Sequence, residues 1–556
     1  MSRRLPLLLG AALVTTALGV VPTAAQATPG AAAPVVAAPG NQPYASYWYP
    51  SSILDWDPAT DPDARFNRSR VPLQPRTSDP ALAANPNARA GEGKIASLVS
   101  FAPTSNNPSQ GSADPNYYAF GYWQYVDKLV FWGGSAGEGL ILAPNPTVID
   151  AAHRNGVKVY GTVFFPPTAY GGRLQWVRDF VQKSGDRYPV ADKLVQAAQY
   201  YGFDGWFVNQ ETGGGDSDLA TDVRKLMQYT EAKSGTEFMW YDAMTTTGAV
   251  DWQNALTPAN SPFLQDGPKR TADSMFLNFG WTSDGLDSSR TLARQLGRSE
   301  YELYSGADTE ANGYNTSVDW NTLFPSGQPH TASLGLYRPE WTWKSATDRA
   351  DFYARDARYW VGANNDPSDT DLSSSWPGLA GYVAESSPIT AKPFVTNFDT
   401  GQGDFYNAAG VRVATGGWNN LSLQDVPPTY RWVVDSSGSK LSPSIDFRRF
   451  LPGRLLAAAD RHPGLHQHRA ALPDQPASRR EHQARPGGQV PGRRPDQAQG
   501  RGFLHRHPGQ LHHRGRRGQH RHRLGAAHAR PLPVRGPDHL PARAAGGRFF
   551  RIEPGV

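Results

Sequence analysis

Short apolar and aromatic runs alternate with helical patterns between residues 91 and 375, and this alternation predicts an α/β fold with a parallel sheet. Eight such runs fill a stretch of the length expected for a (β/α)8 TIM barrel. Polar and aromatic residues close several of them, and a barrel places its active site at these carboxyl ends. The predicted strands are residues 95–101, 125–132, 157–165, 204–211, 237–244, 274–281, 300–307 and 332–338.

Helix-start and helix-stop residues lie between the predicted strands. Asn145 is a favourable cap, a proline follows it at the first helical position, and a glycine follows residue 155, so a helix is predicted over residues 146–155. A second helix, over residues 190–201, is predicted to end at Gly202. These boundaries support repeated β–α units.

The first 27 residues have the pattern of a secretory signal. Arg3 and Arg4 precede an apolar run over residues 5–21, and Ala25-Gln26-Ala27 forms a cleavage site of small residues. The sequence therefore predicts a secreted, extracellular protein. The cleavage pattern favours removal of the run over a retained membrane anchor.

Residues 28–90 are predicted to hold a flexible linker and an aromatic segment that precedes the barrel. The aromatic side chains, among them Tyr47, Trp48 and Trp56, form too much apolar surface to remain in water. We expect this segment to pack against the main domain.

The chain after the predicted barrel falls into two parts. Residues 376–447 show short strand-like runs with glycine and asparagine turns, which predicts an incomplete β-sandwich. Residues 448–556 contain 22 arginines and no lysine, carry a net charge of +16, and hold 12 of the 14 histidines but no tryptophan or tyrosine. The rest of the chain has a net charge of −11.

Three interpretations of this Arg/His/Pro-rich tail remain open. It could be a disordered basic arm for a polyanion, although it has no interleaved aromatic residues for stacking on bases. It could be a histidine-rich metal tract. We favour a third interpretation, in which the tail is a GC-rich coding sequence translated out of frame and is disordered.

Several classes of function are excluded by what the sequence lacks. The chain has no cysteine, so disulfides, thiolate zinc sites and a cysteine nucleophile are excluded. It has no HExxH motif, P-loop or calcium loop, so neither a metal nor a cofactor is predicted. The acidic body argues against a nucleic-acid partner.

The predicted strand over residues 204–211 contains the candidate catalytic residues. Alternate side chains of a strand share one face, so Phe207, Asn209 and Glu211 are predicted to point together. Glycoside hydrolysis normally uses two carboxylates, but the neighbour of Glu211 on this face is an amide. In substrate-assisted glycosidases the 2-acetamido oxygen of the sugar is the nucleophile, and an asparagine suits the task of orienting that group.

The string DGWFVNQE is similar to the DGxDxDxE signature of family 18 chitinases, with Asn209 in place of one aspartate. More closely, residues 41–447 resemble family 85 of the glycoside hydrolases, the endo-β-N-acetylglucosaminidases. The segments that carry the resemblance are QPYASYWYP from Gln42, WQYVDKLVFWGGSAGEG from Trp123, GTVFFPP from Gly161, GFDGWFVNQET from Gly202, MWYDAMT from Met239, DWQNAL from Asp251, FLNFGWT from Phe276 and YSGADTEANGY from Tyr304.

The resemblance implies roles for individual residues. Glu211 matches the catalytic acid/base, and Asn209 matches the asparagine that promotes an oxazoline intermediate. The substrate-binding residues implied are Trp240, Tyr241, Asp242, Trp252, Asn278, Trp281, Tyr304 and Asp308.

The resemblance also implies the substrate: N-glycans of glycoproteins or glycopeptides, cut between the two GlcNAc residues of their core with retention of configuration. Transglycosylation from the same intermediate is a further expectation, as is a monomer without a stable membrane anchor. Two alternatives remain, a non-catalytic glycan-binding protein and a chitinase-like enzyme acting on poly-GlcNAc.

Overall fold

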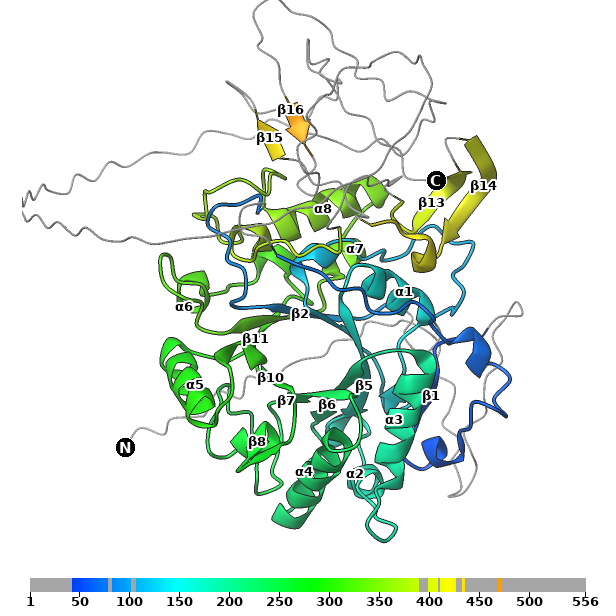
Figure 1. Cartoon of the computed structure of the whole chain (residues 1–556), viewed down its shortest axis with the longest axis vertical. Coiled ribbons are helices and arrows are strands. Elements are labelled where there is room, and N and C mark those ends of the chain that lie inside the picture. Colours follow the sequence, from blue (N-terminus) through cyan, green and yellow to red (C-terminus); the bar gives the residue numbers. More distant parts are fainter. Residues whose placement is uncertain are drawn as a thin grey trace, which may run out of the picture.

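A closed barrel of eight parallel strands is the centre of the molecule (Figure 1). The structure is a computed structural model that describes residues 43–78, 83–101, 107–389, 399–408, 411–426, 433–435 and 469–471. In barrel order the strands are β2 (Ile95–Val99), β3 (Lys128–Phe131), β5 (Lys158–Phe165), β6 (Gly205–Gln210), β7 (Glu237–Tyr241), β10 (Ser274–Leu277), β11 (Leu303–Asp308) and β12 (Ser333–Tyr337). β12 pairs with β2 and closes the ring. The (β/α)8 prediction is confirmed, and every predicted strand overlaps an observed one.

The helices surround the barrel, and their ends carry the capping residues read from the sequence (Figure 1). The Asn145 side chain accepts a hydrogen bond from the Thr147 backbone N–H at 3.0 Å, and Gly202 ends the third helix with a left-handed φ of 82°. The α-helices are α1 (Pro146–Arg154), α2 (Leu174–Phe180), α3 (Pro189–Tyr201), α4 (Ser217–Glu231), α5 (Ser283–Gln295), α6 (Trp320–Leu323), α7 (Trp341–Lys344) and α8 (Arg349–Val361).

Two connections depart from the regular β–α repeat. The described part of the β2–β3 connection holds a single 3-10 turn, Trp123–Tyr125, and no α-helix. The β7–β10 connection instead forms a small hairpin of β8 (Gln265–Asp266) and β9 (Lys269–Arg270). Two further short strands, β1 (Tyr47–Trp48) and β4 (Ile141–Leu142), add an antiparallel extension to β5.

The alternation of side chains along the strands divides the buried residues into two clusters. One lies between strands and helices and includes Trp206 and Val208 of β6. The other fills the barrel and includes Phe207 of the same strand. The barrel cluster consists of Ala96, Leu98, Val130, Trp132, Tyr160, Phe207, Met239, Tyr241, Ala243, Phe276, Tyr304 and Tyr337.

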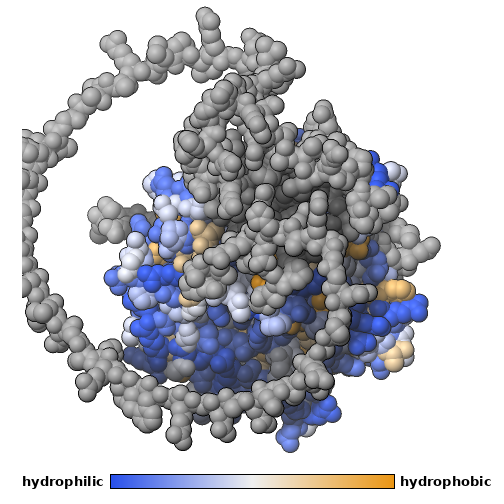
Figure 2. Space-filling view, turned by 45° about the horizontal axis from the view of Figure 1, so that its top comes forward, coloured by the Kyte–Doolittle hydropathy of each residue, from blue (hydrophilic) through white to orange (hydrophobic). Residues whose placement is uncertain are grey.

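The aromatic segment before the barrel packs against the helix layer, as predicted. Trp48 and Trp56 are buried, and both rings contact Tyr201 at the end of α3. On the face shown in Figure 2, the visible described surface is mostly hydrophilic with small hydrophobic patches.

After the barrel, β13 (Gln402–Ala408) and β14 (Val411–Asn419) form an antiparallel hairpin. The Trp123 indole N–H donates to the side chain of Gln424 at 2.7 Å and ties this region to the barrel. A second short pair joins β15 (Val433–Asp435) to β16 (Arg469–Ala471). These elements do not establish the β-sandwich, which stays a prediction. The tail beyond residue 448 lies, apart from β16, outside the described residues.

Candidate active site

Asn209 and Glu211 lie on the same face of β6, at the carboxyl end of the fourth barrel strand. The Asn209 side chain is 5% exposed, and its Nδ2 donates to Glu211 Oε1 at 3.4 Å. Phe207, two residues earlier, belongs to the cluster inside the barrel. The predicted pairing of the amide and the carboxyl is therefore observed.

The surroundings of Glu211 favour the protonated carboxyl at neutral pH. Burial raises its pKa to about 7, while hydrogen bonds from the side chains of Asn209 and Trp252 oppose the rise. A carboxylic acid that gives up its proton near neutral pH suits general acid–base chemistry.

Asn209 retains an unused acceptor. Its Oδ1 is buried and has no hydrogen-bond partner in the described part of the molecule. A buried carbonyl oxygen without a donor is uncommon in folded proteins and often marks a functional position. The atom could accept the N–H of a substrate amide.

Asp242 follows β7 and holds the loop that carries Trp252. Its carboxylate accepts the backbone N–H of Asn254 at 2.7 Å and the Nδ2 of Asn260 at 2.7 Å. Burial raises the pKa of Asp242 to about 7 despite these donors. Because protein donors already occupy both oxygens, Asp242 is a positioning residue for the loop, and the predicted direct contact with substrate is not supported.

Asn254 joins this loop to the neighbouring strand. It has a left-handed φ of 55°, and its Oδ1 accepts from Asn278 Nδ2 and from the backbone N–H of Gly280, each at 2.9 Å. A Cβ at position 280 would lie 2.7 Å from the Asn254 Oδ1, so the contact requires glycine. Asn278 in turn accepts the Tyr241 hydroxyl at 2.7 Å.

This network leads back to Glu211. Tyr241 is 5% exposed inside the barrel, and the charge of Glu211 is one of the influences that raise the pKa of its phenol. Trp252 is 40% exposed, and its side chain is one of the influences that lower the pKa values of both Tyr241 and Glu211. The structure therefore connects three predicted residues, Tyr241, Trp252 and Asn278, to the pair formed by Asn209 and Glu211.

Two predicted substrate contacts are wrong. Trp240 points out of the barrel, where its fully buried ring stacks on Phe263 with centroids 4.5 Å apart. Strand alternation explains this, because Tyr241 next to it points inward. Tyr304 lies inside the barrel but near its amino end, where its hydroxyl donates to Asp127, the residue before β3, at 3.3 Å.

The other two predicted contacts are not placed beside Glu211. Trp281 packs against the outer cluster, and its indole N–H donates to the Gly306 carbonyl at 2.8 Å. Asp308 is exposed at the carboxyl end of β11, where its carboxylate accepts the backbone N–H of Glu310 at 3.0 Å. Both remain predictions as substrate contacts.

Sequence reasoning missed the aromatic lining near this mouth of the barrel. The Trp132 ring packs edge-on against Phe207 and Tyr337, and Phe279 contacts Tyr337 in turn. Trp132 directly follows β3, so its position at a strand end was a usable signal. In the described part of the chain, no three His, Asp or Glu side chains are grouped to hold a metal ion.

The barrel and its acid–amide pair define a class of protein, the (β/α)8 glycoside hydrolases. Residues 102–406 match the model for glycosyl hydrolase family 85. The chain belongs to glycosyl hydrolase family 85, as its motifs predicted.

Named relatives agree with this membership. The chain is 29% identical over 385 residues to a cytosolic endo-beta-N-acetylglucosaminidase of Gallus gallus, covering 68% of this chain and 47% of the relative. It is 24% identical over 391 residues to cytosolic endo-beta-N-acetylglucosaminidase 1 of Arabidopsis thaliana, covering 69% and 52%. The chain thus spans about half the length of the curated relatives it matches.

A solved structure is also similar. The glycoside hydrolase domain of Spr0440, Endo-D from Streptococcus pneumoniae R6, superimposes with a TM-score of 0.65 and 32% identity. The match covers 71% of this chain and 62% of that chain. It supports the same barrel.

The prediction of export is wrong. Relatives from Gallus gallus, Mus musculus, Homo sapiens and Arabidopsis thaliana are all named cytosolic, and these names contradict the predicted secretion. Residues 1–27, on which the prediction depended, lie outside the described residues. No helix in the described part of the chain has the length and apolar character needed to span a membrane.

Proposed function

We propose that this protein is an endo-β-N-acetylglucosaminidase that hydrolyses the GlcNAc-β1,4-GlcNAc bond in the core of N-glycans on glycoproteins or glycopeptides. The observation that carries the proposal is the pair formed by Asn209 and Glu211 on the inner face of β6. Glu211 can donate a proton near neutral pH, and its partner is an amide rather than a second carboxylate. This combination suits a substrate that supplies its own nucleophile.

In the first step, the protonated Glu211 donates to the glycosidic oxygen as the bond to the anomeric carbon breaks. The acetamido oxygen of the sugar attacks that carbon and forms a protonated oxazoline, an oxazolinium ion that keeps its N–H. The unpartnered Oδ1 of Asn209 accepts the acetamide N–H and holds the group in line.

In the second step, the Glu211 carboxylate takes a proton from water as the water attacks the anomeric carbon. The bond from this carbon to the acetamido oxygen breaks, and the acetamide is restored. Two inversions at one carbon give a product with retained configuration. A sugar hydroxyl in place of water gives transglycosylation.

Mass spectrometry of a glycoprotein after incubation tests the proposed activity. One GlcNAc should remain on each glycosylated asparagine, and the rest of the glycan should be released. Intact glycans that nevertheless bind to the protein would favour a glycan-binding protein, and cleavage of poly-GlcNAc alone would favour a chitinase-like enzyme.

A further inference from the structure

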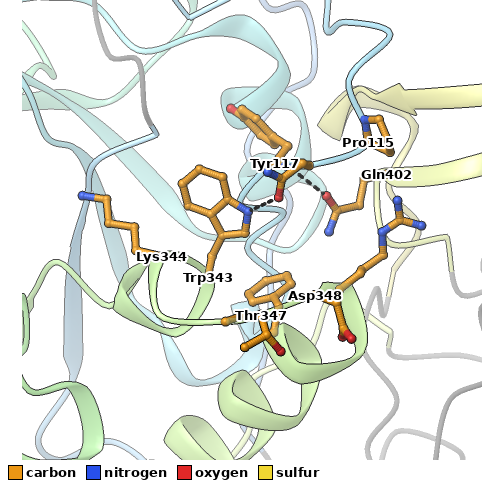
Figure 3. Close-up of a pocket in the computed structure, with 11 residues that line it drawn as sticks. Pro115, Tyr117, Trp343, Lys344, Thr347, Asp348 and Gln402 are labelled. Atoms are coloured by element: carbon orange, nitrogen blue, oxygen red, sulfur yellow. Dashed lines mark hydrogen bonds between the residues drawn. The ribbon is translucent and has the colours of Figure 1, made fainter. Parts of the chain in front are cut away.

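A cavity of about 510 Å³ lies apart from Asn209 and Glu211, between the connection after β12 and the hairpin β13–β14 (Figure 3). Its volume is within the range of about 300–1,000 Å³ that is usual for ligand sites. The residues that line it are Pro115, Asn116, Tyr117, Trp343, Lys344, Ala346, Thr347, Asp348, Arg349, Phe352 and Gln402.

The cavity belongs to the same end of the barrel as Glu211. Its walls come from the segments that follow β2 and β12, two neighbouring strands that run parallel to β6. In the barrel order β6, β7, β10, β11, β12, the last strand is four places from the first, on the opposite side of an eight-stranded ring. An extended ligand with one end at Glu211 would cross the barrel mouth to reach this cavity.

An oriented aromatic ring forms one wall. Trp343 is half-buried, and its indole N–H donates to Asn116 Oδ1 at 3.0 Å, which fixes the plane of the ring (Figure 3). Phe352 is fully buried beneath the cavity. The C–H face of a sugar ring packs well on such an aromatic surface.

The opposite wall is also rigid. Gln402 accepts the backbone N–H of Tyr117 at 3.3 Å through Oε1 and donates to the Tyr353 hydroxyl at 3.0 Å through Nε2. A side chain whose amide is held at both ends keeps its shape when a ligand enters. The wall is therefore preorganised.

The charges around the cavity are largely compensated. Arg349 forms a bidentate pair with Asp404 at 2.9 Å for each contact, and the ammonium of Lys344 lies 3.5 Å from the carboxylate of Glu340. Asp348 uses one carboxylate oxygen to cap α8. Paired cations are poor sites for a phosphate or sulfate, so the composition favours a neutral, hydroxyl-rich ligand.

We propose that this cavity binds a distal, neutral sugar of the same glycan whose core is cleaved at Glu211. The sugar would stack on Trp343, and its hydroxyls would hydrogen-bond to Asn116 and Asp348. The inference rests on the proposed function, and it adds a site that selects for glycan branches far from the scissile bond.

The test compares two glycopeptides with the same peptide, one carrying an extended oligomannose glycan and one trimmed to the innermost sugars. For Trp343→Ala, KM on the extended substrate should rise roughly five- to tenfold with kcat little changed, the size expected for one lost stacking contact. On the trimmed substrate kcat/KM should change less than twofold. Trp343→Phe should restore part of the lost affinity.

Trp341→Phe is the matched control, because Trp341 is on the same helix but donates to the Ala311 carbonyl and does not line the cavity. It should leave both substrates unaffected. Equal losses on both substrates for Trp343→Ala, or no loss on either, would overturn the inference.

A binding measurement separates this inference from the proposed function. Free oligomannose should bind to full-length Glu211→Gln and bind roughly fivefold more weakly when Trp343→Ala is added. If the wild type cleaves neither glycopeptide, the proposed function fails, and this titration still decides whether the cavity holds a sugar. If the affinity for oligomannose were the same with and without Trp343→Ala, the proposed sugar site would be contradicted.

Discussion

At Glu211, burial raises the pKa of the carboxyl to about 7, so the side chain keeps its proton to much higher pH than an exposed glutamate does. The acid step needs this proton. The reaction rate should therefore depend on the protonation of Glu211, and it should fall as this proton is lost.

We expect kcat/KM for glycopeptide to fall about tenfold per pH unit above about pH 7, because Glu211 then loses its proton. Trp252→Phe removes a hydrogen bond that lowers the pKa of Glu211, so the alkaline limb should move to higher pH. Initial rates between pH 5 and 9 measure both effects. If the alkaline limb of the pH profile were at the same pH in Trp252→Phe as in the wild type, Trp252 would have no effect on the pKa of Glu211.

Substitutions of Asn209 and Glu211 should affect different steps of the reaction. Asn209→Ala should lower cleavage of natural glycan by roughly 100-fold or more, because the acetamide loses its orientation, yet it should still use a preformed oxazoline donor. Glu211→Gln should impair both reactions, because both need proton transfer. Parallel assays with the two donors measure this, and equal losses would contradict the division of labour.

At the scale of elements, the loop after β7 depends on a single residue with left-handed backbone. Asn254 supplies both the φ of 55° and the acceptor that joins the loop to Asn278 and Gly280. Sequence could not reveal this role, because it depends on contacts between segments that only the fold brings together.

Asn254→Ala should lower both the melting temperature and kcat/KM, with a loss of stability of about 1–3 kcal/mol from the unpaired donors and the strained backbone. Asn254→Gly should lose less stability, since glycine adopts positive φ without strain. Thermal unfolding and glycopeptide assays of the two variants measure this. Identical stabilities would show that the backbone conformation does not limit the loop.

The sequence predicted the directions of some side chains on the strands but not of others. A period of two placed Asn209 and Glu211 on one face, and the structure agrees. The same rule, applied to Tyr241, would have placed Trp240 on the outside. The position of Tyr304 near the amino end of the barrel follows only from pairing between strands, which the sequence of one strand does not contain.

At the scale of the whole molecule, stability should depend on several buried carboxyls. Burial raises the pKa of Glu211, Asp242 and Asp356 to about 7, so each binds a proton in the folded state at pH values where the unfolded chain has released it. Their contribution to stability therefore decreases as pH rises from about 4 to 7. Glu237 acts oppositely, since the neighbouring Lys128 and Lys158 lower its pKa to about 2, and its contribution is lost as pH falls below about 4.

Asp356→Asn should test this balance without touching the candidate active site. Asp356 is 1% exposed in α8 and accepts the Thr342 hydroxyl at 2.9 Å, a bond that asparagine can keep. Relative to wild type, the variant should gain about 3 kcal/mol of stability between pH 5 and pH 8, because over the roughly two pH units from pH 5 to pH 7 the folded wild type holds a proton that the unfolded chain has released. Urea unfolding at the two pH values measures the difference. A constant difference would show that Asp356 does not ionise in this range.

The unpartnered oxygen of Asn209 has a consequence for the resting enzyme. A buried acceptor without a donor destabilises the fold by about 1–3 kcal/mol, and a bound acetamide group would remove that penalty. Empty protein should accordingly melt earlier than protein saturated with a glycan product that bears this group. Part of the affinity for the sugar would therefore come from relief of this unfavourable burial in the empty protein.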